Sequence, residues 1–278
     1  MYHYIRDDSN LNCLTTEEFR RQVKKIKEKY KIITVEDLIT EKPSYPSCCL
    51  TFDDGIKDGI TNVLPILQEY NVNATFLIPM KILVNSKILS VQKRHLIASK
   101  IGYNKFIKLF NECVEEKYHI EELGIDYRYD SDLIASFKYI LDYMDEYMSN
   151  SIIDKIFKHY FNEKEEFNKI YLNKDDLFLL KESGMEIGTH GFSHRYLGNL
   201  RYNDMETDIE LSCGVYYNTF DKLPFTMSYP MGSYNKLLKR ILRRNGYRAG
   251  ITNNKNKNLN NVDVFELNRY DCIDKEVN

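Results

Sequence analysis

Three short segments of the sequence carry residue types that can bind a metal ion or stabilise a developing negative charge. Thr51-Phe52-Asp53-Asp54-Gly55 sets two acids side by side, and His190-Gly191-Phe192-Ser193-His194 sets two histidines four residues apart. Imidazole is a good ligand for a borderline cation such as zinc, and two histidines from one loop leave room for a carboxylate and an exchangeable water. Ser228-Tyr229-Pro230-Met231-Gly232 ends in a Pro-x-Gly bend, which can present a free backbone N–H to an oxyanion.

Each segment also has an ordinary explanation. An Asp-Asp-Gly sequence is more often a simple turn, two histidines four apart are more often a coincidence, and most Pro-x-Gly segments are plain bends. The histidine pair does not fit the helical His-Glu-x-x-His pattern, because position 191 is glycine and glycine is unfavourable inside a helix. A metal site in a loop is therefore the better interpretation of this pair.

The elements that would position these segments give the combination its specificity, because each segment follows directly after a predicted strand. Short apolar runs alternate with amphipathic stretches, a pattern that favours a parallel α/β barrel or a doubly wound sheet. In such folds the reactive groups lie at the carboxyl ends of the strands. The predicted strands are 47–52, 74–79, 185–189, 225–229 and 248–252. The helices predicted to follow three of them are 63–70, 204–217 and 236–244.

Helix signals elsewhere complete the expected organisation. Thr15 and Glu18 form a capping-box pattern that predicts a helix start, followed by apolar positions at helical spacing. Between residues 90 and 180 the sequence becomes rich in Lys, Glu and Tyr with helical periodicity, which indicates a helical insertion. We therefore expect a single catalytic domain over residues 1–278, with a helical subdomain inserted at 90–180.

The overall composition excludes little but lowers some expectations. With 39 Lys+Arg against 41 Asp+Glu the net charge is -2, so nothing favours nucleic-acid binding. The opening residues lack an export signal, and no 18-residue apolar run predicts a transmembrane segment, so a cytoplasmic protein, at most peripheral to a membrane, is expected. Six scattered cysteines show no paired spacing and are expected to be reduced. The oligomeric state stays open.

Taken together, the three segments resemble the motifs of the polysaccharide deacetylase family, the carbohydrate esterases related to chitin and peptidoglycan deacetylases. The resemblance covers residues 1–80 and 170–272 and implies a distorted (β/α) barrel of about seven strands. It also implies a divalent metal ion, most often Zn²⁺, held by Asp54, His190 and His194. In the same scheme Asp53 is the general base, and the backbone N–H of Met231 stabilises the oxyanion.

The sequence departs from the family pattern at two places. Ser228 stands where the family has arginine, and Leu267-Asn268-Arg269 lacks the histidine of a late Leu-x-His motif that supplies the general acid. Met1-Tyr2-His3-Tyr4 resembles the opening of circularly permuted deacetylases that act on exopolysaccharide, which makes His3 the candidate acid; the alternative is a terminal histidine without a role. Arg269 is the candidate replacement for the missing arginine, and the alternative is a surface ion pair.

The resemblance implies a metal-dependent hydrolase that removes an N-acyl group, with acetyl favoured, from an amino sugar in a surface polysaccharide or its precursor. Removal of a formyl group is one alternative, and a non-catalytic glycan-binding relative is another. The presence of both acids argues for a catalyst, because metal binding needs one carboxylate and hydrolysis needs a second as base.

Overall fold

The computed structural model of the chain describes residues 1–7, 13–125, 130–258, 262–274 and 277. These residues form two compact units. The first holds the described residues of the ranges 1–86 and 168–278, and the second holds those of the range 87–167. The three motifs belong to the first unit.

Five parallel strands form the main sheet of the first unit, and their order in the sheet is their order in the chain. Every residue of these strands is buried, which explains why the sequence shows continuous apolar runs rather than alternation. Consecutive parallel strands need crossover connections, and helices supply them. The strands are β3 (Thr51–Asp53), β4 (Thr75–Ile78), β5 (Glu186–Thr189), β6 (Thr226–Ser228) and β7 (Ala249–Ile251).

Two short segments extend this sheet at its edges. Tyr2 forms a parallel bridge with Phe52 of β3, and Leu267 forms a parallel bridge with Ile251 of β7. Phe52 also stacks on Tyr2, with ring centroids 5.0 Å apart. The edges of the five-stranded sheet are therefore covered by backbone from the beginning and the end of the described chain.

The two edge segments are hydrogen-bonded to each other. The amino group of Met1 donates to the carbonyl of Tyr270 at 2.7 Å, and the N–H of Cys272 donates to the carbonyl of Met1 at 3.1 Å. Five strands thus form a curled sheet, and these hydrogen bonds join the two segments at its edges into an irregular barrel. The distorted (β/α) barrel expected from the sequence is confirmed.

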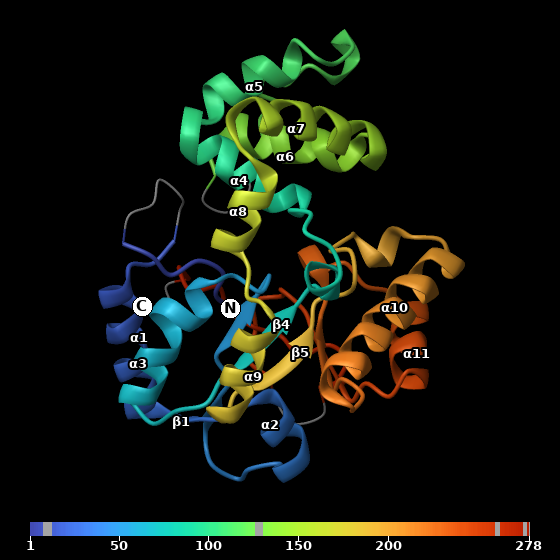
Figure 1. Ribbon diagram of the computed structural model, residues 1–278. Coiled ribbons are helices and arrows are strands. Elements are labelled where there is room, and N and C mark those ends of the chain that lie inside the picture. The colour runs from blue at the N-terminus through green and yellow to red at the C-terminus, as the bar shows by residue number, and fades with distance from the viewer. Residues whose placement is uncertain (8–12, 126–129, 259–261, 275–276, 278) are drawn as a thin grey trace. The chain divides into compact units, whose positions relative to one another are not determined.

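Helices flank this sheet, with α1 and α3 on one side and α10 and α11 on the other (Figure 1). The capping box predicted for Thr15 and Glu18 is present at the start of α1, and similar boxes start α2 and α9. The helices of this unit are α1 (Thr16–Lys29), α2 (Val35–Glu41), α3 (Leu64–Glu69), α9 (Lys174–Glu182), α10 (Tyr202–Phe220) and α11 (Lys236–Arg244).

The predicted strand 47–52 is wrong in one respect, because it is two strands in two sheets. β2 (Ser47–Cys48) pairs with β1 (Lys31–Ile32) in a separate parallel pair, and only β3 belongs to the main sheet. An apolar run records that its residues are buried but not which strand they pair with. A change of pairing partner within one run therefore leaves no sequence signal.

The second unit is helical. Phe137 lies at the centre of an aromatic cluster, with its ring centroid 5.0 Å from that of Phe106 and 5.4 Å from that of Phe110. The buried Lys93 is paired with Asp154 at 2.6 Å. The unit contains α4 (Ser90–Ile101), α5 (Tyr103–Asn111), α6 (Asp132–Tyr143) and α7 (Glu146–Tyr160), and α8 (Glu163–Ile170) crosses the boundary between the units.

This boundary lies at Phe167, so α9 is part of the first unit and not of the helical one. In neither unit does the described chain contain a helix that is both long and apolar enough to span a bilayer.

Candidate active site

The turn after β3 brings both acids of the first motif to the carboxyl end of the sheet. Asp53 is the last residue of β3, and Asp54 follows with a φ of 72°. Gly55 continues the left-handed backbone with a φ of 66°, and a Cβ there would lie 2.8 Å from a methyl carbon of Ile82. Left-handed conformations cost energy for residues other than glycine, although aspartate tolerates them better than most. The strained backbone at Asp54 therefore occurs at the point where two adjacent carboxylates are buried.

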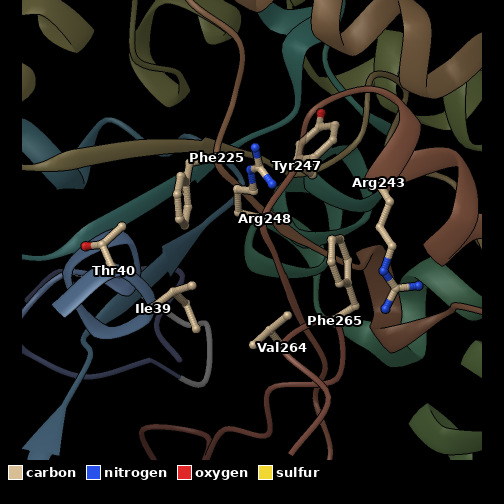
Figure 2. Close-up of a pocket in the computed structure, with 8 residues that line it drawn as sticks. All are labelled: Ile39, Thr40, Phe225, Arg243, Tyr247, Arg248, Val264 and Phe265. Atoms are coloured by element: carbon tan, nitrogen blue, oxygen red, sulfur yellow. The ribbon is translucent and has the colours of Figure 1, made fainter. Parts of the chain in front are cut away.

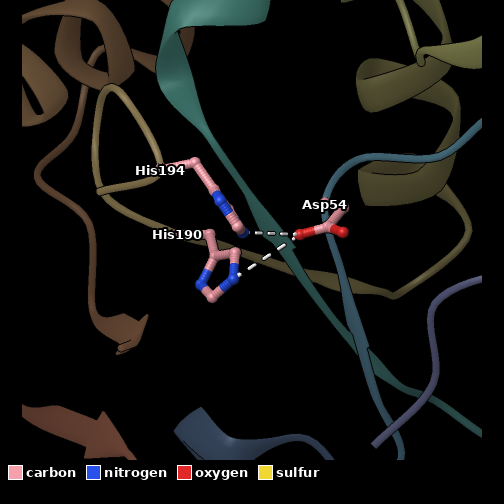
Figure 3. Close-up of side chains that lie close together, drawn as sticks. All are labelled: Asp54, His190 and His194. Carbon is pink, nitrogen blue, oxygen red and sulfur yellow. Dashed lines mark ion pairs between the residues drawn. The ribbon is translucent and has the colours of Figure 1, made fainter. Parts of the chain in front are cut away.

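Asp54 lies against both histidines of the second motif (Figure 3). Its Oδ1 is 3.1 Å from Nε2 of His194 and 3.6 Å from Nε2 of His190, and one ligand atom from each residue lies within 4.8 Å of the others. Ligands about 2.0–2.1 Å from a tetrahedral ion are about 3.3 Å from one another, close to these separations. One carboxylate and two imidazoles are also a donor set that zinc prefers. The cluster therefore fits a divalent metal ion such as zinc.

Ser228 fixes the orientation of His190. Nδ1 of this imidazole lies 2.9 Å from the carbonyl oxygen of Ser228 and 2.5 Å from its hydroxyl oxygen. A carbonyl oxygen can only accept a hydrogen bond, so Nδ1 carries the hydrogen and Nε2 keeps its lone pair toward Asp54. Hydrogen bonds of this kind set the tautomer of metal-binding histidines. The residue that departs from the family pattern thus supports a candidate ligand.

Arg269, from the edge segment beside β7, forms a bidentate pair with Asp53 through the two terminal nitrogens of its guanidinium group. Nη1 donates to Oδ1 at 2.9 Å and Nη2 donates to Oδ2 at 2.6 Å, while Nε donates to the carbonyl of Thr252 at 2.9 Å. The exposed fraction is 8 % for the Arg269 side chain and 1 % for that of Asp53. The two residues therefore form a buried bidentate pair, which is stronger and more directional than a surface ion pair.

These charges decide the ionisation of the buried groups. Burial alone raises the pKa of Asp53, but the positive charges of Arg269 and His190 outweigh it and lower that pKa to about 2. Burial also opposes ionisation of Asp54, and here His194 holds the pKa well below its usual range. Burial lowers the pKa of His190 to about 4 against the opposing effect of Asp53. At neutral pH both acids are ionised and His190 is neutral, as metal binding requires.

His3 lies close to the same carboxylates. The N–H of Tyr2 donates to the carbonyl of Thr51 at 2.8 Å, and the N–H of Asp53 donates to the carbonyl of Tyr2 at 2.9 Å. Tyr2 is therefore paired with the end of β3, and His3 comes directly after Tyr2, just as Asp54 comes directly after β3. It is near enough that its positive form lowers the pKa of both Asp53 and Asp54.

The third motif forms a tight bend immediately after β6. Met231 has a φ of 52° and a ψ of 18°, so the backbone turns sharply between Pro230 and Gly232. Gly232 has a φ of 69°, and a Cβ there would lie 2.0 Å from the amide oxygen of Asn253. The positive φ favours glycine at this position. The side-chain amide of Asn253 donates to the carbonyl of Met231 at 3.3 Å. The bend is held rigidly beside the residue that orients His190.

Asp208 of α10 holds the histidine loop and was not singled out from the sequence. Its carboxylate accepts hydrogen bonds from the N–H groups of Phe192 at 2.7 Å and Ser193 at 3.2 Å, and also from the Ser193 hydroxyl. An acid within a helical stretch usually faces solvent, so the sequence alone carries no signal for this role. Asp208 is only 5 % exposed, and that burial is what identifies it.

A separate hollow of about 500 Å³ lies at the other end of the sheet (Figure 2). Its lining includes Phe225, which precedes β6, and Arg248, which precedes β7, so it opens at the amino ends of the strands. The residues of the metal cluster lie at the carboxyl ends. This hollow and the candidate active site are therefore different places in the barrel.

The chain belongs to the polysaccharide deacetylase family, whose family model matches residues 40–250. This is a family of metalloenzymes and carbohydrate esterases, and it implies an acetylated glycan as substrate. A relative described as the putative polysaccharide deacetylase YxkH of Bacillus subtilis is 20% identical over 275 residues, which is 97% of this chain and 68% of the relative.

Solved structures share the fold at low sequence identity. The Streptococcus pyogenes deacetylase PplD in complex with acetate has a TM-score of 0.61 and 18% identity, and the match covers 97% of this chain and 88% of that one. IcaB from Ammonifex degensii has a TM-score of 0.60 and 13% identity, with 96% and 88% covered. These similarities support the same barrel architecture.

Proposed function

We propose that this protein is a metal-dependent hydrolase that removes an N-acyl group, with acetyl the preferred group, from an amino sugar in a surface polysaccharide or its precursor. The observation that carries the proposal is the buried cluster of Asp54, His190 and His194 with a second ionised acid beside it. Oδ2 of Asp53 lies 3.8 Å from Nε2 of His190. The name of the Streptococcus pyogenes relative, a deacetylase in complex with acetate, supports acetyl as the acyl group.

Asp54, His190 and His194 are the residues that would hold the metal. Zinc bound there supplies Lewis-acid chemistry, because it lowers the pKa of a bound water to about 7 and polarises a carbonyl. Ser228 and Asp208 keep the two imidazoles in place, the first through Nδ1 of His190 and the second through the loop backbone. Such outer contacts preserve the geometry that a metal site needs.

Asp53 is the proposed general base. Its low pKa keeps it in the acceptor form, so it can take the proton of a water that attacks the acyl carbon. Arg269 fixes the carboxylate through two hydrogen bonds, which orients it for this transfer. A carboxylate with so low a pKa is a weak base, so the proton would be transferred during the attack on the acyl carbon, when the water becomes a much stronger acid.

Met231 and His3 complete the proposed mechanism. The backbone N–H of Met231, in the bend after β6, donates a hydrogen bond to the oxygen that becomes negative as the carbonyl is attacked. His3 then donates a proton to the sugar nitrogen as the carbon–nitrogen bond breaks. An amine is a poor leaving group unless it is protonated, so this proton matters more for an amide than for an activated ester.

The test is a screen for release of free amine by zinc-loaded protein. N-acetylglucosamine oligosaccharides, nucleotide-linked N-acetyl sugars and their N-formyl counterparts serve as substrates. We expect amine release from at least one N-acetyl compound, and loss of that release in Asp53→Asn. Binding of the same compounds without release of amine in any of them would contradict the proposal and leave a glycan-binding protein.

A further inference from the structure

Two anchors hold the segment that carries His3, one on each side of it. Before His3, the backbone of Tyr2 exchanges hydrogen bonds with β3. After His3, Asp58 accepts a hydrogen bond from the N–H of Ile5 at 3.0 Å. Asn62 donates to the carbonyl of Ile5 at 2.6 Å. The backbone on both sides of His3 is therefore fixed to the first motif and the residues that follow it.

Asp58 is the centre of the second anchor. Besides the Ile5 N–H, it binds the guanidinium group of Arg6, with Nε at 2.9 Å from Oδ2 and Nη2 at 2.6 Å from Oδ1. Asp58 is 6 % exposed, and Ile5 is fully buried. Three donors from two consecutive residues therefore converge on one buried carboxylate, which is a strong arrangement because two of the three belong to the charged guanidinium group.

The second anchor lies on the same loop as Asp54. Only three residues lie between Asp54 and Asp58, and the loop between them is held by two backbone hydrogen bonds. Leu172 N–H donates to Gly55 O at 2.9 Å, and Lys57 N–H donates to Ile170 O at 2.6 Å. Because Asp54 and Asp58 share a fixed loop, a segment bound to Asp58 is also fixed relative to Asp54.

We propose that Asp58 is a positioning residue that holds the His3 segment where the imidazole can deliver its proton to the leaving nitrogen. This inference rests on the proposed function, in which His3 is the proton donor. Catalytic groups that deliver protons must lie within hydrogen-bond reach of the reacting atom, so a small displacement of the segment is enough to lower the rate.

The chain offers a matched control for Asp58. Lys57 and Asp176 form an ion pair at 2.5 Å with side chains 27% and 14% exposed, against 2.6 Å, 28% and 9% for Arg6 and Asp58. Asp176 binds the same loop one residue away and caps α9, but its described hydrogen bonds do not involve the His3 segment. Asp176→Asn therefore tests what the loss of a comparable ion pair does to stability alone.

The experiment compares two substrates in zinc-loaded variants, an N-acetylglucosamine oligosaccharide and 4-nitrophenyl acetate. A general acid contributes about 10² to 10⁴ in rate, so we expect Asp58→Ala to lower amide turnover about 10- to 100-fold and ester turnover by less than about threefold. Asp58→Asn keeps an acceptor for the Ile5 N–H and should lose less. Asp176→Asn should leave the ratio of the two rates unchanged, and all variants should retain zinc.

A double substitution separates positioning from a merely structural role. If Asp58 acts through His3, adding Asp58→Ala to His3→Ala should cost no further amide turnover, because the two act as one unit. Additive losses, or equal losses on both substrates, would overturn the role of Asp58 while leaving the proposed function intact. Near-normal amide turnover in His3→Ala alone would instead overturn His3 as the proton donor.

A second measurement does not depend on turnover. In zinc-free protein, the imidazole resonances of His3 should move toward those of a free histidine in Asp58→Asn, and should stay in place in Asp176→Asn. Unchanged His3 resonances in Asp58→Asn would contradict the proposal. This variant keeps the size of the side chain, so it remains informative if Asp58→Ala fails to fold.

Discussion

Both ends of the main sheet bury carboxyl groups, but the pKa of Glu186 at the amino end is raised and that of Asp53 at the carboxyl end is lowered. Glu186 begins β5 at the amino end, where it accepts hydrogen bonds from the hydroxyls of Thr75 at 2.7 Å and Thr226 at 2.5 Å. Burial raises the pKa of Glu186 in spite of these bonds. Asp53 ends β3 at the carboxyl end, where burial opposes ionisation as well, yet its pKa falls to about 2.

The difference lies in the partners and not in the depth of burial. Glu186 is 7 % exposed and Asp53 is 2 % exposed, so desolvation acts on both. Neutral hydroxyls stabilise a carboxylate modestly, whereas the Arg269 guanidinium supplies a full positive charge at hydrogen-bond distance. A buried acid thus becomes a candidate for chemistry where the fold brings a cation to it, and stays structural where it does not.

The largest effect is expected at the metal cluster. Asp54→Asn replaces a charged ligand by a neutral one. Loss of a residue that only supports a ligand lowers metal affinity about 10- to 100-fold, so zinc affinity should fall by more than this in Asp54→Asn. Zinc content after dialysis against a weak chelator, measured by elemental analysis, checks this. Glu186→Gln at the opposite end of the sheet is the control and should bind zinc like the wild type. Equal zinc content in all three proteins would show that Asp54 is not a ligand.

Asp53→Asn should separate the base from the ligand. The variant should keep zinc but lose at least about 100-fold in amide turnover, because a general base contributes on that scale. Zinc content and turnover measured on the same sample test both halves of this expectation. If Asp53→Asn lost zinc while Asp54→Asn remained loaded, the roles of the two neighbours would be reversed.

Arg269→Met should leave Asp53 buried without the guanidinium partner, as Glu186 is at the amino end of the sheet. Removing one partner of a buried ion pair costs about 3–5 kcal/mol, so the free energy of unfolding at pH 7 should fall by that order. An acid with a lowered pKa contributes stability above its unfolded pKa, near 3.8, and loses it as the pH falls toward 2. The difference between wild type and variant should therefore be wide at pH 7 and should shrink as the pH falls from about 4 toward 2.

Denaturant unfolding of both proteins between pH 2 and pH 7 measures that difference. Lys239 provides a control, since its ion pair with Asp263 at 2.8 Å lies on the more exposed surface of the same unit. Lys239→Met should cost about 1 kcal/mol or less. If Arg269→Met lowered the free energy of unfolding no more than Lys239→Met does, the buried pair would contribute no more to stability than the exposed one.

The smallest effect is expected at Glu186. A group with a raised pKa contributes stability below its unfolded pKa, near 4.5, and loses it as the pH rises through its folded pKa. Glu186→Gln cannot ionise, so the variant should gain stability relative to the wild type as the pH is raised from 4 to 8. Parallel stability curves over this range would show that Glu186 has the same pKa in the folded and the unfolded protein.

That the three candidate metal ligands lie close together could be expected from the sequence because of a general property of parallel sheets. The carboxyl ends of β3 and β5 meet at one edge, so Asp54, His190 and His194 could be expected to lie together once the strands were recognised. The strand and helix pattern was readable for the same reason, since buried strands and amphipathic helices each have a characteristic periodicity.

Side-chain partners from distant segments could not be read in this way. Nothing near Ser228 or Asp208 in the sequence indicates that one orients His190 and the other holds its loop. Arg269 was a candidate only because an expected arginine was missing, and it lies 216 residues from Asp53 in the chain. Such contacts leave no periodic pattern in the sequence, because they depend on where two elements of the fold meet in space.

By itself, then, the sequence determined the alternation of strands and helices and the places where reactive side chains follow strands, because both arise from local burial and periodicity. The tertiary structure alone decided that the edge segments are hydrogen-bonded to each other beside β3 and β7. That closure brings His3 and Arg269 to the acids of the first motif and gives Asp53 its low pKa. The physical reason is that a charge acts on a buried group through distance in space, and the closure of a barrel sets that distance without a local sequence pattern.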